Sequence, residues 1–201
     1  MNYLKKSLLF VLLFISTGAF SQLEAKFDAL GTVLGMTAVK AEYLLNENIG
    51  AELSFNLRFG KPFLTHSEET YKQFGGGVKL ESRYYFSPDY IADGFYLGLY
   101  IRSQSFSYYS KEEVNDEAQE IIKTQEFTSY GPVLGFKFFF DSRITLDGGI
   151  GVGKYLSYSY VSSLDGQNIK GDGVFDLFTT FGIGYRFDLG EEKMDADFEE
   201  F

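Results

Sequence analysis

The sequence predicts an all-β fold, an eight-stranded antiparallel up-and-down transmembrane β-barrel. Long segments alternate apolar and polar residues, and this repeat of two gives a strand two unlike faces. In the longest segment, 173–190, odd positions such as Phe181 and Ile183 are apolar, whereas Asp176 and Arg186 lie at even positions. This segment is longer than an ordinary globular strand and suits one that crosses a bilayer, which takes about 9 to 11 residues plus its ends.

The first 21 residues have the organisation of a secretory signal peptide. Two lysines precede a short apolar run over 7–15, and the A-x-S sequence at 19–21 predicts cleavage before Gln22. The apolar run falls short of the roughly 20 residues that a spanning helix needs. We therefore expect a signal peptide over 1–21, a barrel over 22–190 and an acidic periplasmic tail over 191–201.

The composition narrows the chemistry available to the chain. It has no cysteine, so neither disulfides nor thiol chemistry contribute, and its aromatic residues are all Phe and Tyr. The net charge of −10 provides no basic stripe for phosphates, which argues against nucleic acid as a partner. Because no other segment reaches 18 consecutive apolar residues, a helical membrane protein is excluded.

Eight segments carry the alternation. They are 24–34, 36–45, 49–59, 77–86, 94–109, 126–140, 144–160 and 173–190. In the first two, Phe27 and Val39 oppose lysines at neighbouring positions. The third is the most regular, since Leu53 and Phe55 alternate with Glu52 and polar residues.

The later strands follow the same rule. In the fourth, Val78 and Leu80 oppose Lys79, and the fifth begins with the same alternation but loses it among serines and tyrosines. The sixth places several phenylalanines opposite Lys137, and the seventh sets Leu146 and its apolar neighbours against polar residues. Glycine, proline, asparagine and aspartate separate these segments, as turns require.

Three tight turns test the strand register. Each turn has three residues if Val33 faces Thr37, Leu45 faces Ile49 and Phe140 faces Ile144. The apolar face then continues across each hairpin, as paired positions require.

The connections fall into two groups by length. Apart from the tight first one, the odd-numbered connections are long, at 60–76, 110–125 and 161–172, and the even-numbered ones are short. The connection at 110–125 is acidic and has room for one helical turn. Short turns on one side and longer loops on the other are typical of bacterial barrels, which places both termini in the periplasm.

The polar face carries nearly balanced charges in a strongly acidic chain. We predict a lumen charge network of Lys40, Glu42, Glu52, Arg58, Lys79, Glu81, Arg83, Arg102, Lys137, Asp147, Asp176 and Arg186. The same face also holds Lys26, Asp28 and Asp188. A packed interior requires such balance because a buried unpaired charge costs several kcal/mol.

Alternation alone does not say which face points inward. A soluble lipocalin-like barrel would bury the apolar face around a ligand and leave the charges in water. The charge balance, the length of the strands and aromatic residues near strand ends favour the inverted, membrane arrangement. These aromatic groups include Phe59 and Phe63, Tyr84 to Phe86, Tyr108 and Tyr109, Phe138 to Phe140, and Tyr155, Tyr158 and Tyr160.

With this layout the chain resembles the small eight-stranded outer-membrane barrels of the OmpA, OmpX and OmpW type and the uncharacterised outer-membrane β-barrel families. Its last strand carries Thr180-x-Gly182-x-x-Tyr185-x-Phe187, which is similar to the insertion signal of such barrels. The resemblance implies location in the cell outer membrane and recognition by the barrel-assembly machinery. The tail over 191–201 departs from the many members that end at the aromatic residue.

Few residues offer catalytic or metal chemistry. His66 is the only histidine and lies in a polar connection beside Ser67 and acidic residues, where a solvated loop histidine is the expected interpretation. The acidic cluster of Glu112, Glu113, Asp116, Glu117 and Glu120 lacks the spacing of a calcium loop. We therefore expect no enzyme activity and no cofactor.

The leading hypothesis is an outer-membrane protein with a structural or interaction role, a lumen filled by charges and no open pore. The interior of an eight-stranded barrel is just wide enough for side chains to fill it. The alternative is a narrow small-molecule transporter or receptor of the OmpW type, which needs a gap in the charges near Ser103, Ser105, Ser107 and Tyr108. Outer-membrane lipid is an expected partner, whereas the sequence specifies no extracellular ligand.

Overall fold

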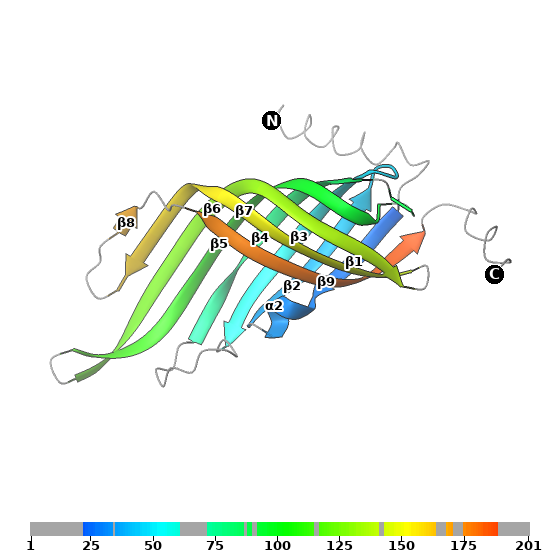
Figure 1. The fold of residues 1–201 in the computed structure, drawn as a ribbon. Helices are drawn as coiled ribbons and strands as arrows, with labels where there is room; N and C mark the ends of the chain where they lie inside the picture. Colours follow the sequence, from blue (N-terminus) through cyan, green and yellow to red (C-terminus); the bar gives the residue numbers. More distant parts are fainter. Residues whose placement is uncertain are drawn as a thin grey trace, which may run out of the picture.

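The structure, a computed structural model, forms one closed antiparallel β-barrel (Figure 1). It describes residues 22–33, 35–60, 72–86, 88–89, 92–114, 117–140, 143–163, 168–170 and 175–188. The predicted signal peptide, the acidic tail and His66 lie outside these residues. Among the described residues, no helix is long and apolar enough to span a membrane.

Nine strands and one short helix make up the described chain. They are β1 (Gln22–Asp28), α2 (Ala29–Val33), β2 (Met36–Leu44), β3 (Ile49–Gly60), β4 (Lys72–Tyr85), β5 (Gly94–Val114), β6 (Glu117–Phe140), β7 (Ile144–Ser162), β8 (Asn168–Lys170) and β9 (Asp176–Asp188). Eight of the strands form the wall, and β8 is a three-residue strand that pairs only with the far end of β7.

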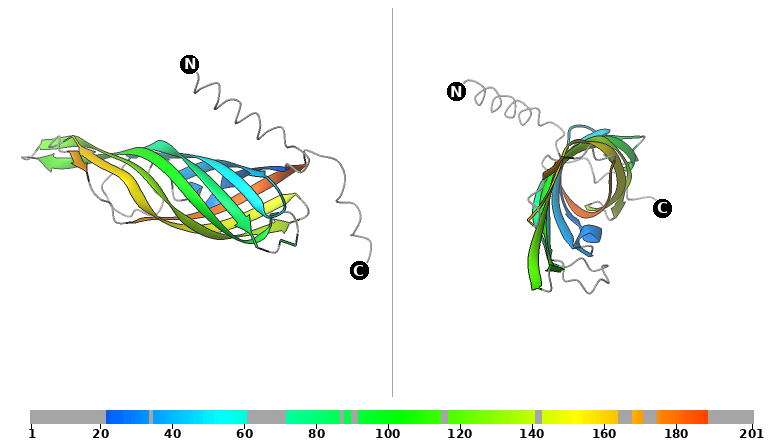
Figure 2. Two further views of the ribbon diagram at one scale, coloured as in Figure 1. Left: turned by 90° about the horizontal axis from the view of Figure 1, so that it is seen from above. Right: turned by 90° about the vertical axis from the view of Figure 1, so that its left-hand side faces the viewer.

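The wall closes because β1 pairs with β9 and β7 pairs with both β9 and β6. Every neighbouring pair is antiparallel, and the right-hand panel of Figure 2 shows the sheet curving round into a ring. Closure satisfies the backbone groups that an open sheet edge would leave unpaired. The predicted eight-stranded antiparallel barrel is therefore confirmed.

Two of the three predicted turns have the expected register. Leu44 pairs with Gly50, and the Leu45 amide donates to the Ile49 carbonyl at 2.9 Å. Phe140 pairs with Ile144, as the third turn requires.

The first predicted turn is wrong. β1 ends at Asp28 instead of Leu34, because the chain turns into α2. The Asp28 carboxylate accepts a hydrogen bond from the Gly31 amide at 2.7 Å, and the Thr32 hydroxyl donates to the Asp28 carbonyl at 2.8 Å. These local bonds offer the backbone an alternative to the ladder, so pairing of β1 with β2 stops at Phe27 opposite Val39.

The connection predicted at 110–125 is also different. β5 continues to Val114 and β6 starts at Glu117, so a long hairpin takes the place of an acidic loop. This hairpin projects beyond the other strands at the lower left of Figure 1. β4 similarly starts at Lys72, five residues before the predicted start of the strand.

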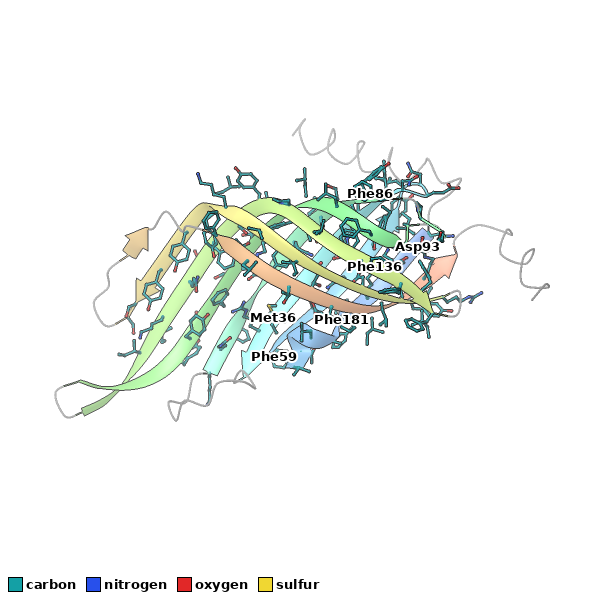
Figure 3. All side chains as sticks on the ribbon, in the orientation of Figure 1. Met36, Phe59, Phe86, Asp93, Phe136 and Phe181 are labelled. Carbon is teal, nitrogen blue, oxygen red and sulfur yellow. The ribbon has the colours of Figure 1, made fainter. Side chains whose placement is uncertain are left out.

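The two ends of the barrel differ. The ends of β2, β4, β6 and β9 and the starts of β1, β3, β5 and β7 lie at one end, called here the short-turn end. The opposite, long-loop end carries α2 and the projecting hairpin. Figure 3 shows Phe86 and Asp93 near the short-turn end and Met36 and Phe59 towards the long-loop end.

The outer face of the wall is apolar and the inner face is charged. Large apolar side chains with about half to two thirds of their surface exposed surround the barrel, among them Phe55, Leu57, Leu80, Leu99, Leu134, Phe138, Ile150 and Leu177. A water-soluble protein seldom exposes a continuous apolar surface of this kind, whereas a barrel in lipid requires one. The inward and outward faces are thus arranged as in a barrel that faces lipid.

Candidate functional site: the charged interior and the barrel mouth

Charged side chains from all eight wall strands are buried inside the barrel. The cations are Lys26, Lys40, Lys79, Arg83, Arg102, Lys137 and Arg186, and the strand carboxylates are Glu24, Asp28, Glu42, Glu52, Glu81, Asp147 and Asp176. Each of these cations lies within ion-pair distance of at least one of the carboxylates. Pairing is necessary here because a buried unpaired charge is expensive.

Lys137 joins opposite walls of the barrel. Its Nζ lies 2.7 Å from Glu42 Oε2 and 3.0 Å from Glu24 Oε2. Lys137 belongs to β6 and Glu42 to β2, and the strand order places these two strands four positions apart in a ring of eight. Arg186 donates to the other oxygen of Glu24, with its Nε at 2.7 Å from Oε1.

Lys26 and Arg83 occupy the centre of this cluster. Lys26 Nζ lies 2.6 Å from Asp147 Oδ2 and also contacts Glu42. The Arg83 guanidinium lies 2.9 Å from the same Asp147 oxygen and 2.7 Å from Glu52 Oε2. Two cations therefore share the carboxylate of Asp147, and the pairs connect β1, β4 and β7.

A further group lies beside β9. Lys40 pairs with Asp28 Oδ2 at 3.2 Å and donates to the Thr180 hydroxyl. Thr180 in turn donates to Asp28 at 3.2 Å.

Nearer the long-loop end, Asp176 of β9 gathers partners from two other strands, β5 and β6. The Arg102 Nε donates to Asp176 Oδ2 at 2.7 Å, and the Tyr100 hydroxyl donates to the same oxygen at 3.0 Å. Ser129 donates to it as well. Arg102 belongs to β5 and Asp176 to β9, which lie three positions apart in the ring, so this contact also crosses the interior.

Aromatic rings lie beside most of these cations. Lys137 Nζ is 4.6 Å from the Tyr85 ring centroid, and the Arg83 guanidinium carbon is 4.6 Å from that of Tyr96. Arg102 lies 4.7 Å from the centroid of Phe178. Such cation–π contacts add attraction where the cation has lost water.

The structure brings eleven of the twelve network residues predicted from the sequence into the buried interior. The twelfth, Arg58, faces the same side but is only partly buried. Lys26 and Asp28 are buried with them, whereas the side chain of Asp188 lies outside what the structure describes. The predicted network omits Glu24, which is also buried in the interior. The sequence could have identified it, because Glu24 lies two residues before Lys26 and therefore on the same face of the strand.

The four residues of the predicted assembly signal divide between the two faces. Thr180 and Gly182 face inward, and a Cβ at Gly182 would approach the Asp147 carboxylate. Tyr185 and Phe187 face outward, with ring centroids 4.9 Å apart. Their recognition by assembly machinery stays a prediction.

The interior also contains a group of carboxylates within metal-ligand distance of one another. Ligand oxygens of Glu42, Glu52 and Asp147 lie within 4.8 Å. Lys26 and Arg83 each contact all three of these carboxylates. Their ammonium and guanidinium groups supply the positive charge that a metal ion would bring, so the arrangement favours ion pairing.

The polarity of the wall reverses towards the long-loop end. Beyond Ile101 in β5 the outer positions become serines, and most of the facing outer positions of β6 and β7 are polar too. Val161 and the exposed Leu156, both in β7, are the apolar exceptions. The polar outer residues are Ser103, Ser105, Ser107, Thr124, Glu126, Thr128, Ser157 and Ser159. Several are hydrogen-bonded across strands, such as Ser105 with Glu126 at 3.1 Å. The apolar belt therefore ends at this level.

Aromatic side chains occupy the inner face where the polarity has reversed. Phe106 and Phe127 are buried, and their ring centroids lie 6.0 Å apart. Tyr108 packs on Phe106 and Tyr155 on Phe127, with centroid distances of 5.3 and 5.2 Å. Tyr158 then packs on Tyr155.

These contacts correct part of the predicted aromatic girdle. Tyr108, Tyr155 and Tyr158 lie against inward-facing rings and do not form an outer belt. A bulge in β7 contributes to the reversal, because the pairing shifts between Thr128 and Ser129. At the short-turn end, by contrast, outward rings do gather, and they include Tyr84, Phe86, Phe95, Phe138, Phe140, Tyr185 and Phe187.

The family of the chain follows from a match to its sequence over residues 7–170, most of the chain. The chain belongs to the DUF3575 family. The family is described as proteins of unknown function, so membership assigns no activity to this DUF3575 chain.

Two solved structures are similar to this DUF3575 chain at low identity. A major outer membrane protein from Thermus thermophilus is 16% identical, with a TM-score of 0.44 over 83% of this chain and 99% of that one. The N-terminal β-barrel domain of Pseudomonas aeruginosa OprF is 13% identical, with a TM-score of 0.37 over 83% of this chain and 96% of that one. No curated protein matches the chain.

Proposed function

We propose that this chain is an outer-membrane β-barrel with a structural or interaction role, whose lumen is closed by its own ion-paired side chains. The observation that carries the proposal is the pairing of Lys137 with Glu42 from opposite walls, 2.7 Å apart. The Arg102 contact with Asp176 crosses the interior at a second level. Contacts of this kind at two levels support a lumen that is closed to a continuous water path.

The apolar outer face supports insertion in lipid, and the expected signal peptide supports export. In this orientation the short-turn end, with the start of β1 and the end of β9, faces the periplasm. The long-loop end, with the projecting β5–β6 hairpin, is then displayed outside the cell, where it provides the interaction surface. The sequence has no cysteine and a single histidine, and on this ground we also propose that the chain is not an enzyme and uses no cofactor.

Two measurements test the proposal. The full-length chain is expressed in a Gram-negative host, and its mature form should fractionate with the outer membrane and migrate faster in SDS gels before boiling than after. Purified folded protein should then give no stable conductance steps in planar bilayers. Release into the soluble fraction without detergent contradicts the membrane assignment, and stable ion conductance by the heat-modifiable form contradicts the closed lumen.

A charge-reversal pair separates a structural network from a transport path. Arg83→Glu places a further carboxylate among the four that Arg83 now contacts, which are Glu42, Glu52, Glu81 and Asp147. The heat-modifiable form should therefore be largely lost if the network is structural. Lys154→Glu is the matched control, because Lys154 is exposed on β7. Normal folding of Arg83→Glu together with altered solute uptake would instead identify a transport path.

A further inference from the structure

Arg58 differs from the other cations on the inner face. Seven buried cations have carboxylate partners, but within the described part of the chain no carboxylate pairs with Arg58. Its guanidinium carbon lies 4.1 Å from the centroid of the Phe106 ring. The charged group that does interact with it is a second cation, Arg102, and its hydrogen-bonding neighbour is the Tyr108 hydroxyl. Asp176 balances Arg102, so among the described residues Arg58 leaves one positive charge at this end of the interior.

The neighbouring strands explain why Arg58 can lie there. Arg58 pairs with Gly75 in β4, and Gly75 pairs with Phe106 in β5. A Cβ at Gly75 would approach the backbone of Phe106 too closely. The glycine therefore permits the close approach of Phe106 to β4. The arginine side chain can then extend over Gly75 towards the ring.

Tyr108 does not neutralise Arg58. Tyr108 lies at the long-loop end, beyond the apolar belt, and burial raises the pKa of its phenol. The phenol therefore remains protonated at neutral pH, and no described residue compensates the positive charge of Arg58.

A second polar group on the same face lacks a partner. Gln104 precedes Phe106 by two residues, so both side chains lie on the inner face. Gln104 is 4% exposed, and its Oε1 atom has no hydrogen-bond partner among the described residues. A buried amide oxygen without a donor is costly, and a hydroxyl from a bound molecule would satisfy it.

We propose that the long-loop mouth of the barrel binds a small hydroxylated organic anion with a flat apolar ring. Arg58 would pair with the anionic group, Gln104 would accept from the hydroxyl, and the rings of Phe127, Tyr155 and Tyr158 would contact the ligand ring. Arg58 and the two tyrosines are partly exposed, which leaves the site open at its rim. This site is independent of whether the lumen below it conducts, so the two proposals fail separately.

A binding measurement with a defined probe tests this site. Purified full-length mature protein in zwitterionic detergent is titrated with 4-hydroxybenzoate and, separately, with the uncharged 4-hydroxybenzamide. The carboxylate should bind saturably and about tenfold or more tightly than the amide, because a hydrogen bond to a charged group contributes more than a neutral one. Equal binding of the two probes, or no saturable carboxylate binding in the millimolar range, overturns the proposal.

Variants locate the binding. Arg58→Gln should weaken 4-hydroxybenzoate about tenfold or more, and Arg58→Lys should weaken it less because the charge remains. Gln104→Leu should remove the preference for 4-hydroxybenzoate over benzoate. Arg143→Gln is the matched control, since it removes one positive charge at the short-turn end and should leave affinity unchanged. Folding of each variant is checked by heat-modifiable migration, and unchanged affinity in folded Arg58→Gln contradicts the assignment.

Discussion

The Nζ atom of Lys137 lies 2.7 Å from Glu42 Oε2 although the two residues belong to opposite walls of the barrel. Lys137 is 1% exposed and Glu42 is fully buried, so water does not screen the attraction between them. Lys137 also reaches Glu24, and Glu42 also contacts Lys26 and Arg83. The pair is thus one link in a network that ties β1, β2, β4 and β6 together.

Removing one partner of this pair should destabilise the barrel. Lys137→Met leaves the Glu24 and Glu42 carboxylates with one cation fewer in a buried site, and the expected loss is about 3 kcal/mol of unfolding free energy. Lys154→Met, at an exposed position of β7, should change stability by less than about 0.5 kcal/mol. Reversible urea unfolding in detergent micelles or lipid vesicles, followed by tyrosine fluorescence, measures both.

The double variant Lys137→Met with Glu42→Gln tests whether the two side chains interact directly. Because it removes the cation and the anion together, its loss of stability should be smaller than the sum of the single losses by about 1 to 3 kcal/mol. Strict additivity would show that the pair is not coupled and would remove the main support for a network that crosses the lumen.

The apolar belt should tolerate charge only beyond its edge. Leu99 is 66% exposed on the outer face of β5, and Ser105 lies on the same face of the same strand beyond the reversal of polarity. Leu99→Lys places an ammonium group in lipid and should cost about 2 to 4 kcal/mol. Ser105→Lys should cost at most about 1 kcal/mol because that level lies in the headgroup region or in water. Equal costs at the two positions would show that the edge of the belt lies elsewhere.

The sequence alone predicts the strands of the wall well because one rule governs them. Where lipid lies outside and charge inside, alternation such as Glu52, Leu53, Ser54 and Phe55 identifies both the strand and its faces. The same rule predicts the buried positions of Lys137 and Glu42. It does not predict which cation meets which carboxylate, because that depends on strands far apart in the sequence.

The rule fails where its physical cause is absent. Beyond the belt, water replaces lipid, so Ser105 faces outward and Phe106 faces inward although the strand is unbroken. The loss of pattern therefore resembles the end of a strand, and alternation alone predicts a loop where the β5–β6 hairpin lies. At Asp28, a side-chain hydrogen bond to the Gly31 amide competes with the strand pairing. The sequence pattern of Phe27, Ala29 and Gly31 therefore predicts a strand where the chain forms α2.

Gly182 and Gly148, on the paired strands β9 and β7, test whether a glycine is needed because a side chain would not fit. Gly182 in β9 pairs with Asp147 in β7, and a Cβ on Gly182 would collide with the Asp147 carboxylate and lie 3.7 Å from Lys40 Nζ. Gly182→Ala should therefore lower stability by about 1 to 3 kcal/mol, since overpacking here displaces an ion pair. Gly148→Ala is the control, because its Cβ would meet Phe181 at an ordinary 3.8 Å.

The comparison is made on purified protein by urea unfolding, so that it measures the folded barrel and not recognition during assembly. Gly148→Ala should be neutral or slightly stabilising, since alanine has less freedom in the unfolded chain. If Gly182→Ala proves equally neutral in purified protein but assembles poorly in cells, the glycine serves assembly and the steric account is wrong.

Neighbouring residues of β3 should report opposite environments. Leu53 is 38% exposed on the outer face, whereas Ser54 is buried and its hydroxyl donates to Glu52 at 3.2 Å. The chain has no native cysteine, so Leu53→Cys and Ser54→Cys each give a single site for a nitroxide spin label. In lipid vesicles, the label at Leu53 should collide with dissolved oxygen and be protected from a water-soluble nickel complex, because apolar lipid surrounds it. The label at Ser54 should be poorly accessible to both reagents or react too slowly to be introduced, because the ion-paired side chains fill the interior. Strong quenching at Leu53 by the nickel complex would show that the apolar face contacts water, and the assignment of the two faces would then be reversed.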